Sequence, residues 1–299
     1  MTSGDLVELK GVYKSFGEVR ALDGFDMTVR PGELLALLGE NGAGKTTAIS
    51  LMLGLEQPDA GHIRLFGERP GAVEVRRRIG VMMQDVFMAP ELLVHEHLTL
   101  FASYYPNGYT ADEILEFVNA TALRNRKYGV LSGGQKRLIQ FAIALCGRPK
   151  LLFLDEPTVG LDVQARKDLW ATLRRLIQQG CSILLTTHYL EEAESLADRI
   201  VVLAKGRVVS SGTVKEVTQT ISTRRITCVS KLTPEEVGAW PGVTSVVVED
   251  GLLVLAVTHA ELETTVRRLL ASDETLVDLQ VSQAGLADAF LKITQESRQ

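Results

Sequence analysis

The stretch "LLALLGENGAGKTT", residues 34–47, decides the fold of this 299-residue chain. Its first half is apolar without alternation, which predicts a strand buried on both faces, and a helical pattern follows over 45–54. Between them, "GENGAGKTT" at 39–47 matches the pattern Gly-x4-Gly-Lys-[Ser/Thr]. A strand, a glycine-rich loop and a helix in this order predict a cradle of backbone N–H groups for the phosphates of a nucleotide.

The side chains of this loop indicate which nucleotide is bound and with which ion. Lys45 would neutralise the β- and γ-phosphate oxygens, and the hydroxyl of Thr46 is placed to ligate Mg²⁺. We therefore expect ATP and Mg²⁺ to bind here, with Lys45 also acting in catalysis. The other residues expected to contact ATP are Gly39, Glu40, Asn41, Gly42, Ala43, Gly44 and Thr47.

The rest of the N-terminal two thirds predicts an α/β fold around a parallel sheet. Continuous apolar runs recur and are separated by helical patterns, which is typical of strands covered on both faces. Residues 1–30 instead carry shorter, more alternating strands, so we expect a small antiparallel layer at the edge of the core. The further apolar runs are "IGVMM" 79–83, "LLFLD" 151–155 and "SILLTT" 182–187.

A helical subdomain is expected to be inserted at about residues 88–148. "TADEILEFVNAT" begins at a plausible N-cap, Thr110, and has one apolar face. Further on, "LSGGQ" at 131–135 stands at the start of a helix that Ser132 would cap. Free N–H groups at a helix start favour an anion, so the chain carries a second phosphate-binding stretch.

Composition excludes several classes of function. The chain has 32 Lys+Arg against 37 Asp+Glu, a net charge of −5, so the footprint of a nucleic-acid binder is missing. Its three cysteines have no metal-ligand or disulfide spacing and fit a reduced compartment. No signal peptide is visible, and no apolar run approaches the ~20 residues that span a bilayer. A membrane role would therefore act through a partner chain.

Two strand ends carry candidate catalytic groups. In "LLFLDE", Asp155 would hold Mg²⁺, and Glu156 would be the general base for the attacking water. "LLTTH" ends another apolar strand at His188, which would bind the γ-phosphate and align the water with Glu156. The carboxyl ends of parallel strands meet at one edge of a sheet, so these groups should converge.

The sequence divides into 1–220, a nucleotide-binding domain, and 221–299, a small α+β domain. In the second part, Asp250-Gly251 lies between two β-branched runs and predicts a hairpin. Thr258 and Glu261 match a capping box before an amphipathic helix. This part shows no chemical motif, so we expect it either to help hold a dimer together or to be a passive appendage.

Together these motifs resemble the nucleotide-binding subunit of ABC transporters. The resemblance covers residues 5–215 in the family's order: the phosphate loop, Gln84 in "VMMQD", "LSGGQ", "LLFLDE", "VGLD" at 159–162, and His188. It implies a P-loop NTPase core of RecA-like type. Val159 stands where many members carry Ser or Ala, which is the one visible departure.

The resemblance also implies why there are two phosphate-binding stretches. In this family two such domains dimerise head to tail, and each ATP lies between one chain's phosphate loop and the other chain's signature. Leu131, Ser132, Gly133, Gly134 and Gln135 would thus face the partner's ATP. By the same resemblance Phe16 stacks on adenine, with Tyr13 as the other candidate, Gln84 contacts Mg²⁺ and the water, and Asp162 ties the two sites together.

Finer features resemble the ATPases of drug, antibiotic and peptide exporters whose permease is a separate chain. This implies an ATP hydrolase that acts as a homodimer, or as a heterodimer with a paralogue, beneath an integral-membrane permease. It would be cytoplasmic and peripheral on the inner face of the membrane. The alternative is a soluble ABC ATPase that acts on ribosomes, DNA repair or iron–sulfur assembly.

Overall fold

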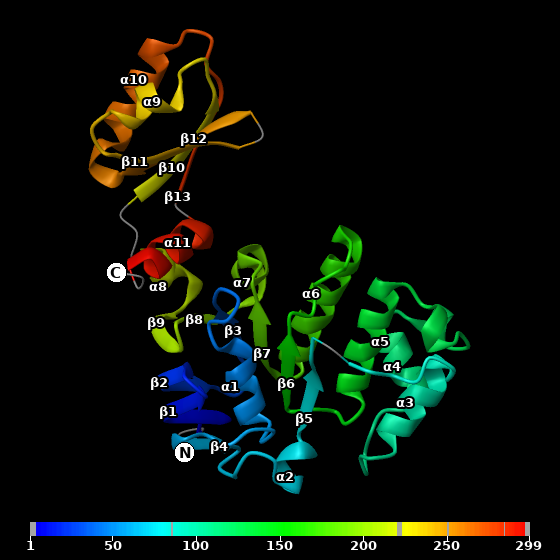
Figure 1. Cartoon of the computed structure of the whole chain (residues 1–299). Helices are drawn as coiled ribbons and strands as arrows, with labels where there is room; N and C mark the ends of the chain where they lie inside the picture. The colour runs from blue at the N-terminus through cyan, green and yellow to red at the C-terminus, as the bar shows by residue number, and fades with distance from the viewer. Residues whose placement is uncertain (1–3, 85, 220–222, 250, 284, 297–299) are drawn as a thin grey trace. The chain divides into compact units, whose positions relative to one another are not determined.

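The computed structural model describes residues 4–84, 86–219, 223–249, 251–283 and 285–296. The chain divides into two compact units, Met1–Val214 and Lys215–Gln299, which Figure 1 shows in blue to green and in yellow to red. No helix in the described ranges is long and apolar enough to cross a membrane.

A six-stranded sheet forms the centre of the first unit, in the order β5-β6-β7-β3-β8-β9. The first five strands in this order are parallel, and β9 pairs antiparallel with β8 at the edge. The predicted apolar runs are therefore strands. Their bounds are β3 Leu34–Leu38, β5 Ile79–Met82, β6 Leu151–Asp155, β7 Ser182–Thr187, β8 Arg199–Ala204 and β9 Arg207–Gly212.

The two faces of this sheet bury different cores, which explains the continuous apolar runs. Leu34, Leu152 and Ile183 pack into one hydrophobic cluster, whereas their neighbours Leu35 and Phe153 pack into the other. Helices lie beside the strands in Figure 1. In this part of the chain they are α1 Lys45–Met52, α2 Val73–Arg76, α6 Val163–Gln178 and α7 Leu190–Leu196.

The N-terminal layer is an antiparallel sheet in the order β2-β1-β4. The predicted antiparallel edge layer is thus present, formed by β1 Val7–Phe16 and β2 Val19–Val29. The sequence did not predict its third strand, β4 Ala60–Leu65, which pairs with β1. Only Ile63 and Leu65 of β4 are buried, so the strand carries little apolar signal.

The helical lobe lies between β5 and β6 in sequence and contains α3, α4 and α5. Thr110 caps α4 as predicted, since its hydroxyl accepts a hydrogen bond from the N–H of Glu113. The lobe's apolar residues join the same cluster as one face of the sheet, so it is fixed to the core. Its elements are α3 Val94–Ala102, α4 Ala111–Phe117, the 3-10 turns η1 Thr121–Leu123 and η2 Tyr128–Val130, and α5 Gly133–Leu145.

The second unit contains a four-stranded antiparallel sheet in the order β11-β12-β10-β13. The chain order β10-α9-β11-β12-α10-β13 is a split βαβ arrangement. It agrees with the α+β fold expected for this part. Bounds are α8 Val214–Gln219, β10 Thr223–Val229, α9 Pro234–Gly238, β11 Val243–Glu249, β12 Leu252–Thr258, α10 Leu262–Ser272, β13 Val277–Gln283 and α11 Leu286–Glu296.

One local prediction in this unit is wrong, and another lies partly outside the described residues. β11 and β12 are antiparallel neighbours, as the hairpin requires, but Asp250 of the predicted turn lies outside the described residues. The predicted capping box of Thr258 and Glu261 is wrong, because Thr258 makes no capping bond and the chain first forms the 3-10 turn η3 His259–Glu261. α10 therefore begins only at Leu262.

Candidate functional site

The glycine-rich loop joins the end of β3 to the start of α1. Gly42 and Gly44 adopt φ of 80° and 111°, which non-glycine residues rarely tolerate. Gly39 is constrained by space instead, because an added Cβ would lie 2.6 Å from the carbonyl oxygen of Leu203. The loop can therefore keep this shape only with glycine at these positions, and it places backbone N–H groups at the start of α1.

Lys45 is the first residue of α1 and is 7% exposed. Its Nζ donates to the carbonyl oxygens of Gly39 at 2.7 Å and Glu40 at 3.1 Å, so the ammonium lies within the loop. Burial lowers the pKa of Lys45, and the nearby carboxylates of Glu156 and Asp155 oppose that shift. A phosphate beside this buried cation would be strongly attracted to it.

A cavity of about 440 Å³ opens in front of the loop. It brings together residues from the loop, from the segment after β5 and from the ends of β6 and β7. The predicted convergence of the strand ends is thus present. The lining residues are Val19, Ala21, Asn41, Gly42, Gly44, Lys45, Thr46, Thr47, Gln84, Glu156 and His188.

Asp155 at the end of β6 is nearly fully buried and has one oxygen free for a further ligand. Its Oδ1 accepts a hydrogen bond from the hydroxyl of Thr186, whereas Oδ2 has no partner among the residues that the structure describes. A buried carboxylate oxygen without a donor is costly unless a cation or its water meets it. With the oxygen-bearing side chains of Thr46 and Gln84 on the cavity, the donor set fits Mg²⁺, which prefers oxygen ligands.

Glu156 and His188 meet at the edge of this cavity. Nδ1 of His188 lies 3.1 Å from Oε1 of Glu156. Glu156 has φ of 49°, a left-handed conformation that is uncommon for a residue with a side chain. Its N–H donates to the carbonyl oxygen of Thr186 at 3.0 Å, which fixes this backbone. The arrangement can hold a water molecule beside a carboxylate base.

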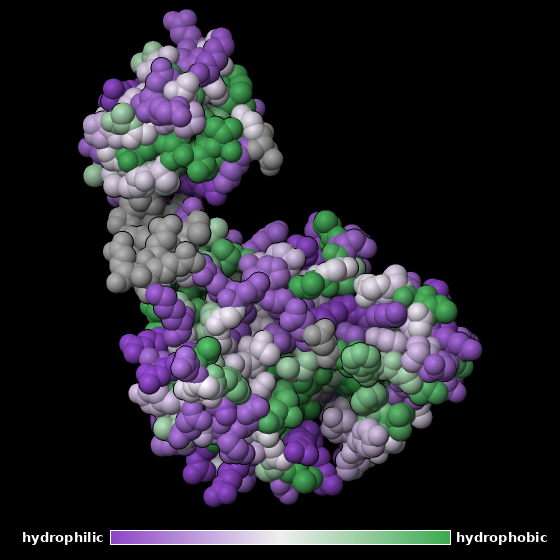
Figure 2. All heavy atoms as spheres, in the orientation of Figure 1, coloured by the Kyte–Doolittle hydropathy of each residue, from purple (hydrophilic) through white to green (hydrophobic). Residues whose placement is uncertain are grey.

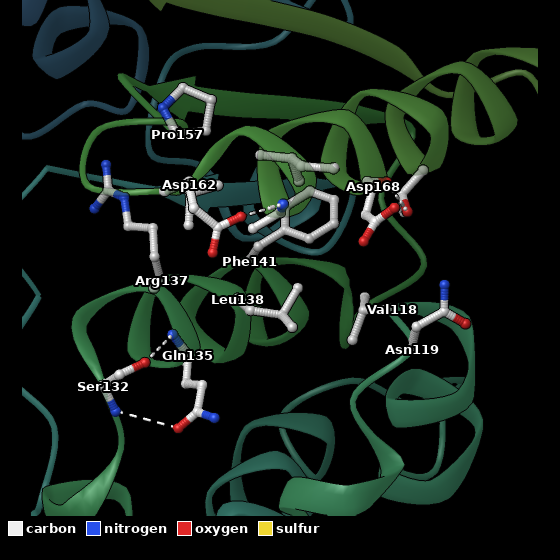
Figure 3. A pocket seen from close by; sticks show the side chains of 15 residues that line it. Val118, Asn119, Ser132, Gln135, Arg137, Leu138, Phe141, Pro157, Asp162 and Asp168 are labelled. Carbon is white, nitrogen blue, oxygen red and sulfur yellow. Dashed lines mark hydrogen bonds between the residues drawn. The ribbon is translucent and has the colours of Figure 1, made fainter.

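The signature stretch lies on the helical lobe, at the start of α5. Ser132 caps the helix as predicted: its hydroxyl accepts from the N–H of Gln135 at 3.2 Å, and Oε1 of Gln135 accepts from the N–H of Ser132 at 3.2 Å. Figure 3 shows both bonds. Leu131 is buried in the lobe. Among the described residues, those of the signature are not in the lining of the phosphate-loop cavity, so the two phosphate-binding stretches remain apart within one chain.

Gly133 and Gly134 lie at positions where the folded chain has room for a side chain. A Cβ added to Gly133 would meet no described atom within 4 Å, and one at Gly134 would make ordinary contacts at 3.5 Å and beyond. Neither residue has a positive φ. Neither the backbone conformation nor the surrounding described atoms therefore require glycine at these two positions.

A second cavity, of about 270 Å³, lies between α5 and α6 and is drawn in Figure 3. Leu138 and Phe141 line it from α5, and Asp162 lines it from the start of α6. Asp162 caps α6, because its Oδ1 accepts a hydrogen bond from the N–H of Ala165 at 2.8 Å. This bond fixes the end of the "VGLD" loop next to the signature helix.

Phe16 stands at the end of β1, opposite Val19 of β2 in the antiparallel ladder. Its side chain is 48% exposed, and Nζ of Lys14 lies 5.0 Å from its ring centroid. Val19 lines the cavity, so the end of β1 lies next to it, although Phe16 is not among the lining residues. Tyr13 instead lies with its ring against Gly24 on the neighbouring strand.

Sequence reasoning missed Arg137, two residues after the signature. Its Nη1 donates to the carbonyl oxygen of Gln84 at 2.9 Å, and its Nη2 to those of Asp155 at 2.9 Å and Glu156 at 2.7 Å. One guanidinium thus joins α5 to both segments that carry metal and base candidates. A buried arginine inside a helical pattern gives no sequence signal of this, because its partners are backbone carbonyls.

Comparisons with known proteins agree with this geometry. A family model described as ABC transporter matches residues 22–159. Nod factor export ATP-binding protein I of Burkholderia thailandensis is 44% identical over 215 residues, 69% of this chain and 70% of that protein. The protein of that name from Rhizobium sp. is 43% identical, again over 69% and 70% of the two chains.

Solved structures of ATP-binding cassettes have the same fold. The ATP-binding subunit of an ABC transporter superposes with a TM-score of 0.66 at 30% identity, covering 72% of this chain and 92% of that one. A dimeric cassette in a post-hydrolysis state, bound to ADP and Pi, has a TM-score of 0.63 at 26% identity and covers 69% and 98%. With its phosphate loop, strand-end acids and signature helix in place, this chain belongs to the family of ABC transporter ATP-binding proteins.

Proposed function

We propose that this chain is the ATP-hydrolysing subunit of an ABC exporter and works as a dimer attached to a separate membrane permease. The relatives described above are named as export ATP-binding proteins, and each matches 69% of this chain. ATP would close the dimer, closure would drive the permease, and hydrolysis would reset it. The chain would act at the cytoplasmic face of the membrane.

In this proposal the phosphate loop holds the triphosphate. Backbone N–H groups of residues 39–44 and the Lys45 ammonium would contact the β- and γ-phosphates, as the buried position of Nζ favours. Thr46, Gln84 and Asp155 would hold Mg²⁺, directly or through water. The ion, when bound, would supply positive charge beside the phosphate oxygens on which negative charge develops.

Glu156 would act as the general base. Water attacks the γ-phosphorus in line with the bond to ADP, and the carboxylate of Glu156 takes the proton that the water loses. His188 would keep Glu156 oriented through its Nδ1, at 3.1 Å from Oε1, and would present its other ring nitrogen to the γ-phosphate. Gln84 would place the water. Phe16, exposed at the end of β1, would stack on the adenine ring.

The observation that carries the proposal is the separation of two complementary half-sites in one chain. The cavity holds the loop, base and histidine, whereas Ser132, Gly133 and Gly134 lie on another lobe with room beside their backbone. A head-to-tail partner would place its own signature against the phosphates bound by this chain. Asp162 would contact the partner next to that site. Because both halves are complete, two copies of this chain would form two working sites.

We propose that the permease binds the surface formed by α3 and the segment between β5 and α3. Phe87 is fully exposed, and Leu100 and Tyr104 are 46% and 64% exposed on and just after α3. His97 of α3 lies 2.9 Å, through Nε2, from the carbonyl oxygen of Ala89, so this segment lies against α3. Figure 2 shows green, hydrophobic side chains at the surface of the lobe. An apolar surface of this kind marks a protein contact.

The test is the substitution Glu156→Gln, which keeps shape and removes the proton acceptor. ATP hydrolysis should fall by at least ~10²-fold while ATP binding is retained. The variant should accumulate as an ATP-bound dimer, which light scattering can detect. Hydrolysis at the wild-type rate would contradict the role given to Glu156, and a wild-type chain without ATPase activity would contradict the function as a whole.

A further inference from the structure

A buried carboxyl group lies behind the catalytic edge. Glu192 in α7 is 0% exposed, although it is a charged residue type. Its Oε1 accepts a hydrogen bond from Nε1 of Trp170 at 3.2 Å, and its Oε2 accepts one from the hydroxyl of Thr158 at 3.3 Å. The hydroxyl of Thr187 is a third partner. Burial of a carboxyl group is costly unless donors surround it, so this arrangement requires these three side chains.

The three donors come from the segments that carry the proposed catalytic groups. Thr158 follows Glu156 by two residues, and Thr187 directly precedes His188. Trp170 belongs to α6, the helix that begins where the "VGLD" loop ends. One carboxyl group is therefore hydrogen-bonded to the base-bearing loop, to the histidine-bearing strand and to the helix beyond the loop.

The loop after Glu156 needs such an anchor. Pairing between β6 and β7 fixes the backbone as far as Asp155 opposite Thr186. At Glu156 the chain turns away with a positive φ, and the bond from the N–H of Leu161 to the carbonyl oxygen of Thr158 closes the loop on itself. A conformation of this kind persists only when its surroundings hold it.

We propose that Glu192 is a positioning residue that keeps Glu156 and His188 at hydrogen-bonding distance by binding Thr158 and Thr187 at once. The inference rests on the proposed function, because it assigns Glu192 to the orientation of the proposed base. It predicts a much larger effect on the rate of the chemical step than on ATP binding, since the phosphate loop and Lys45, which hold most of the triphosphate, follow another strand.

The decisive substitution is Thr158→Val, which keeps the shape of the side chain and removes the hydroxyl that Glu192 binds. The kcat for ATP hydrolysis should fall on the order of tenfold or more, because small misplacements of catalytic groups are costly, with KM for ATP essentially unchanged. Thr158→Ser restores the hydroxyl and should restore kcat.

Thr172→Val is the matched control. Thr172 is also a buried threonine, on the same helix as Trp170, but its hydroxyl donates to the carbonyl oxygen of Asp168 at 2.9 Å in its own helix. Its kcat should equal that of the wild type. If Thr158→Val does not fold, Trp170→Phe, which removes only the N–H donor from a largely retained ring, should lower kcat in the same way.

The inference is overturned if Thr158→Val keeps the wild-type kcat, if it changes KM and kcat in parallel, or if Thr172→Val loses as much activity. Melting temperatures of the nucleotide-free variants separate these results from a loss of folded protein. A chain in which Glu156→Gln abolishes hydrolysis but Thr158→Val does not would leave the proposed function standing and reject only the role of Glu192.

Discussion

The substitution Gly133→Ala distinguishes the requirements of folding from those of the proposed phosphate contact in a dimer. Gly133 is the first residue of α5, has no positive φ, and a Cβ there would meet no described atom within 4 Å. The chain itself can therefore accept alanine at this position. A phosphate that approaches the helix start from a second chain would meet the new methyl group instead of the backbone N–H.

The two effects have opposite signs. Alanine leaves the unfolded chain less conformational freedom than glycine does, so where its φ and ψ fit, the folded chain should become more stable by about 0.4–1 kcal/mol. For a domain of this size that corresponds to a rise of roughly 1–4 °C in the melting temperature. Hydrolysis should fall on the order of 10²-fold, because displacing the phosphate by about 1 Å disturbs its alignment with the base.

The assay combines a melting curve of the nucleotide-free protein with the ATPase rate at saturating ATP. Gly238→Ala is the control: it lies at the end of α9 in the second unit, and its Cβ would lie 3.8 Å from Cγ2 of Val246. It should leave hydrolysis unchanged. A Gly133→Ala variant that keeps the wild-type rate, or that melts well below the wild type, would refute the argument that this glycine serves an outside group.

Three further predictions follow from single groups. Arg137→Lys should lower hydrolysis on the order of tenfold, because one ammonium cannot replace a fork that bonds to Gln84 and Glu156 together; an unchanged rate would contradict this. Burial raises the pKa of Glu192 above its usual 4.5, against hydrogen bonds and nearby Arg166, so the folded chain holds this proton more tightly than the unfolded chain does. The free energy of unfolding of the wild type should then fall as the pH rises from 4.5 through that raised pKa, whereas the Glu192→Gln variant should not show this fall. If the melting temperatures of the two proteins change with pH in the same way, this effect of Glu192 is excluded. Burial raises the pKa of the Cys146 and Cys181 thiols to about 12, so a thiol reagent at pH 8 should modify them only after unfolding.

The central sheet was predictable because its strands are buried on both faces. Leu34–Leu38 is entirely apolar, and Leu151–Asp155 is apolar up to its final residue. Short apolar runs without alternation are typical of parallel strands that are covered on both faces. β4 was missed because Ala60–Leu65 exposes most of its length and takes its place through pairing with β1. Its position is a tertiary property with little local signal.

The residues of the candidate site were predictable where they belong to a short sequence motif with a fixed spacing. Lys45, Glu156 and His188 line one cavity, as their motifs indicated. Arg137 and Glu192 were not predicted, because they bind carbonyl and hydroxyl groups of distant segments. No sequence motif marks such contacts. The capping box at residue 258 failed for the reverse reason: its pattern was local, but a 3-10 turn took the place of the first helical turn.

Mixing two inactive variants tests the shared site most directly. Lys45→Ala damages the phosphate loop, and Ser132→Arg damages the signature without touching the cavity. In a head-to-tail dimer of one variant with the other, both lesions fall in one site and the second site is intact. Each variant alone should be inactive, and an equal mixture should recover up to about a quarter of the wild-type rate, since half of the dimers would carry one good site of two. No recovery in the mixture, or full activity of Ser132→Arg alone, would contradict the claim that the signature completes the site of another chain.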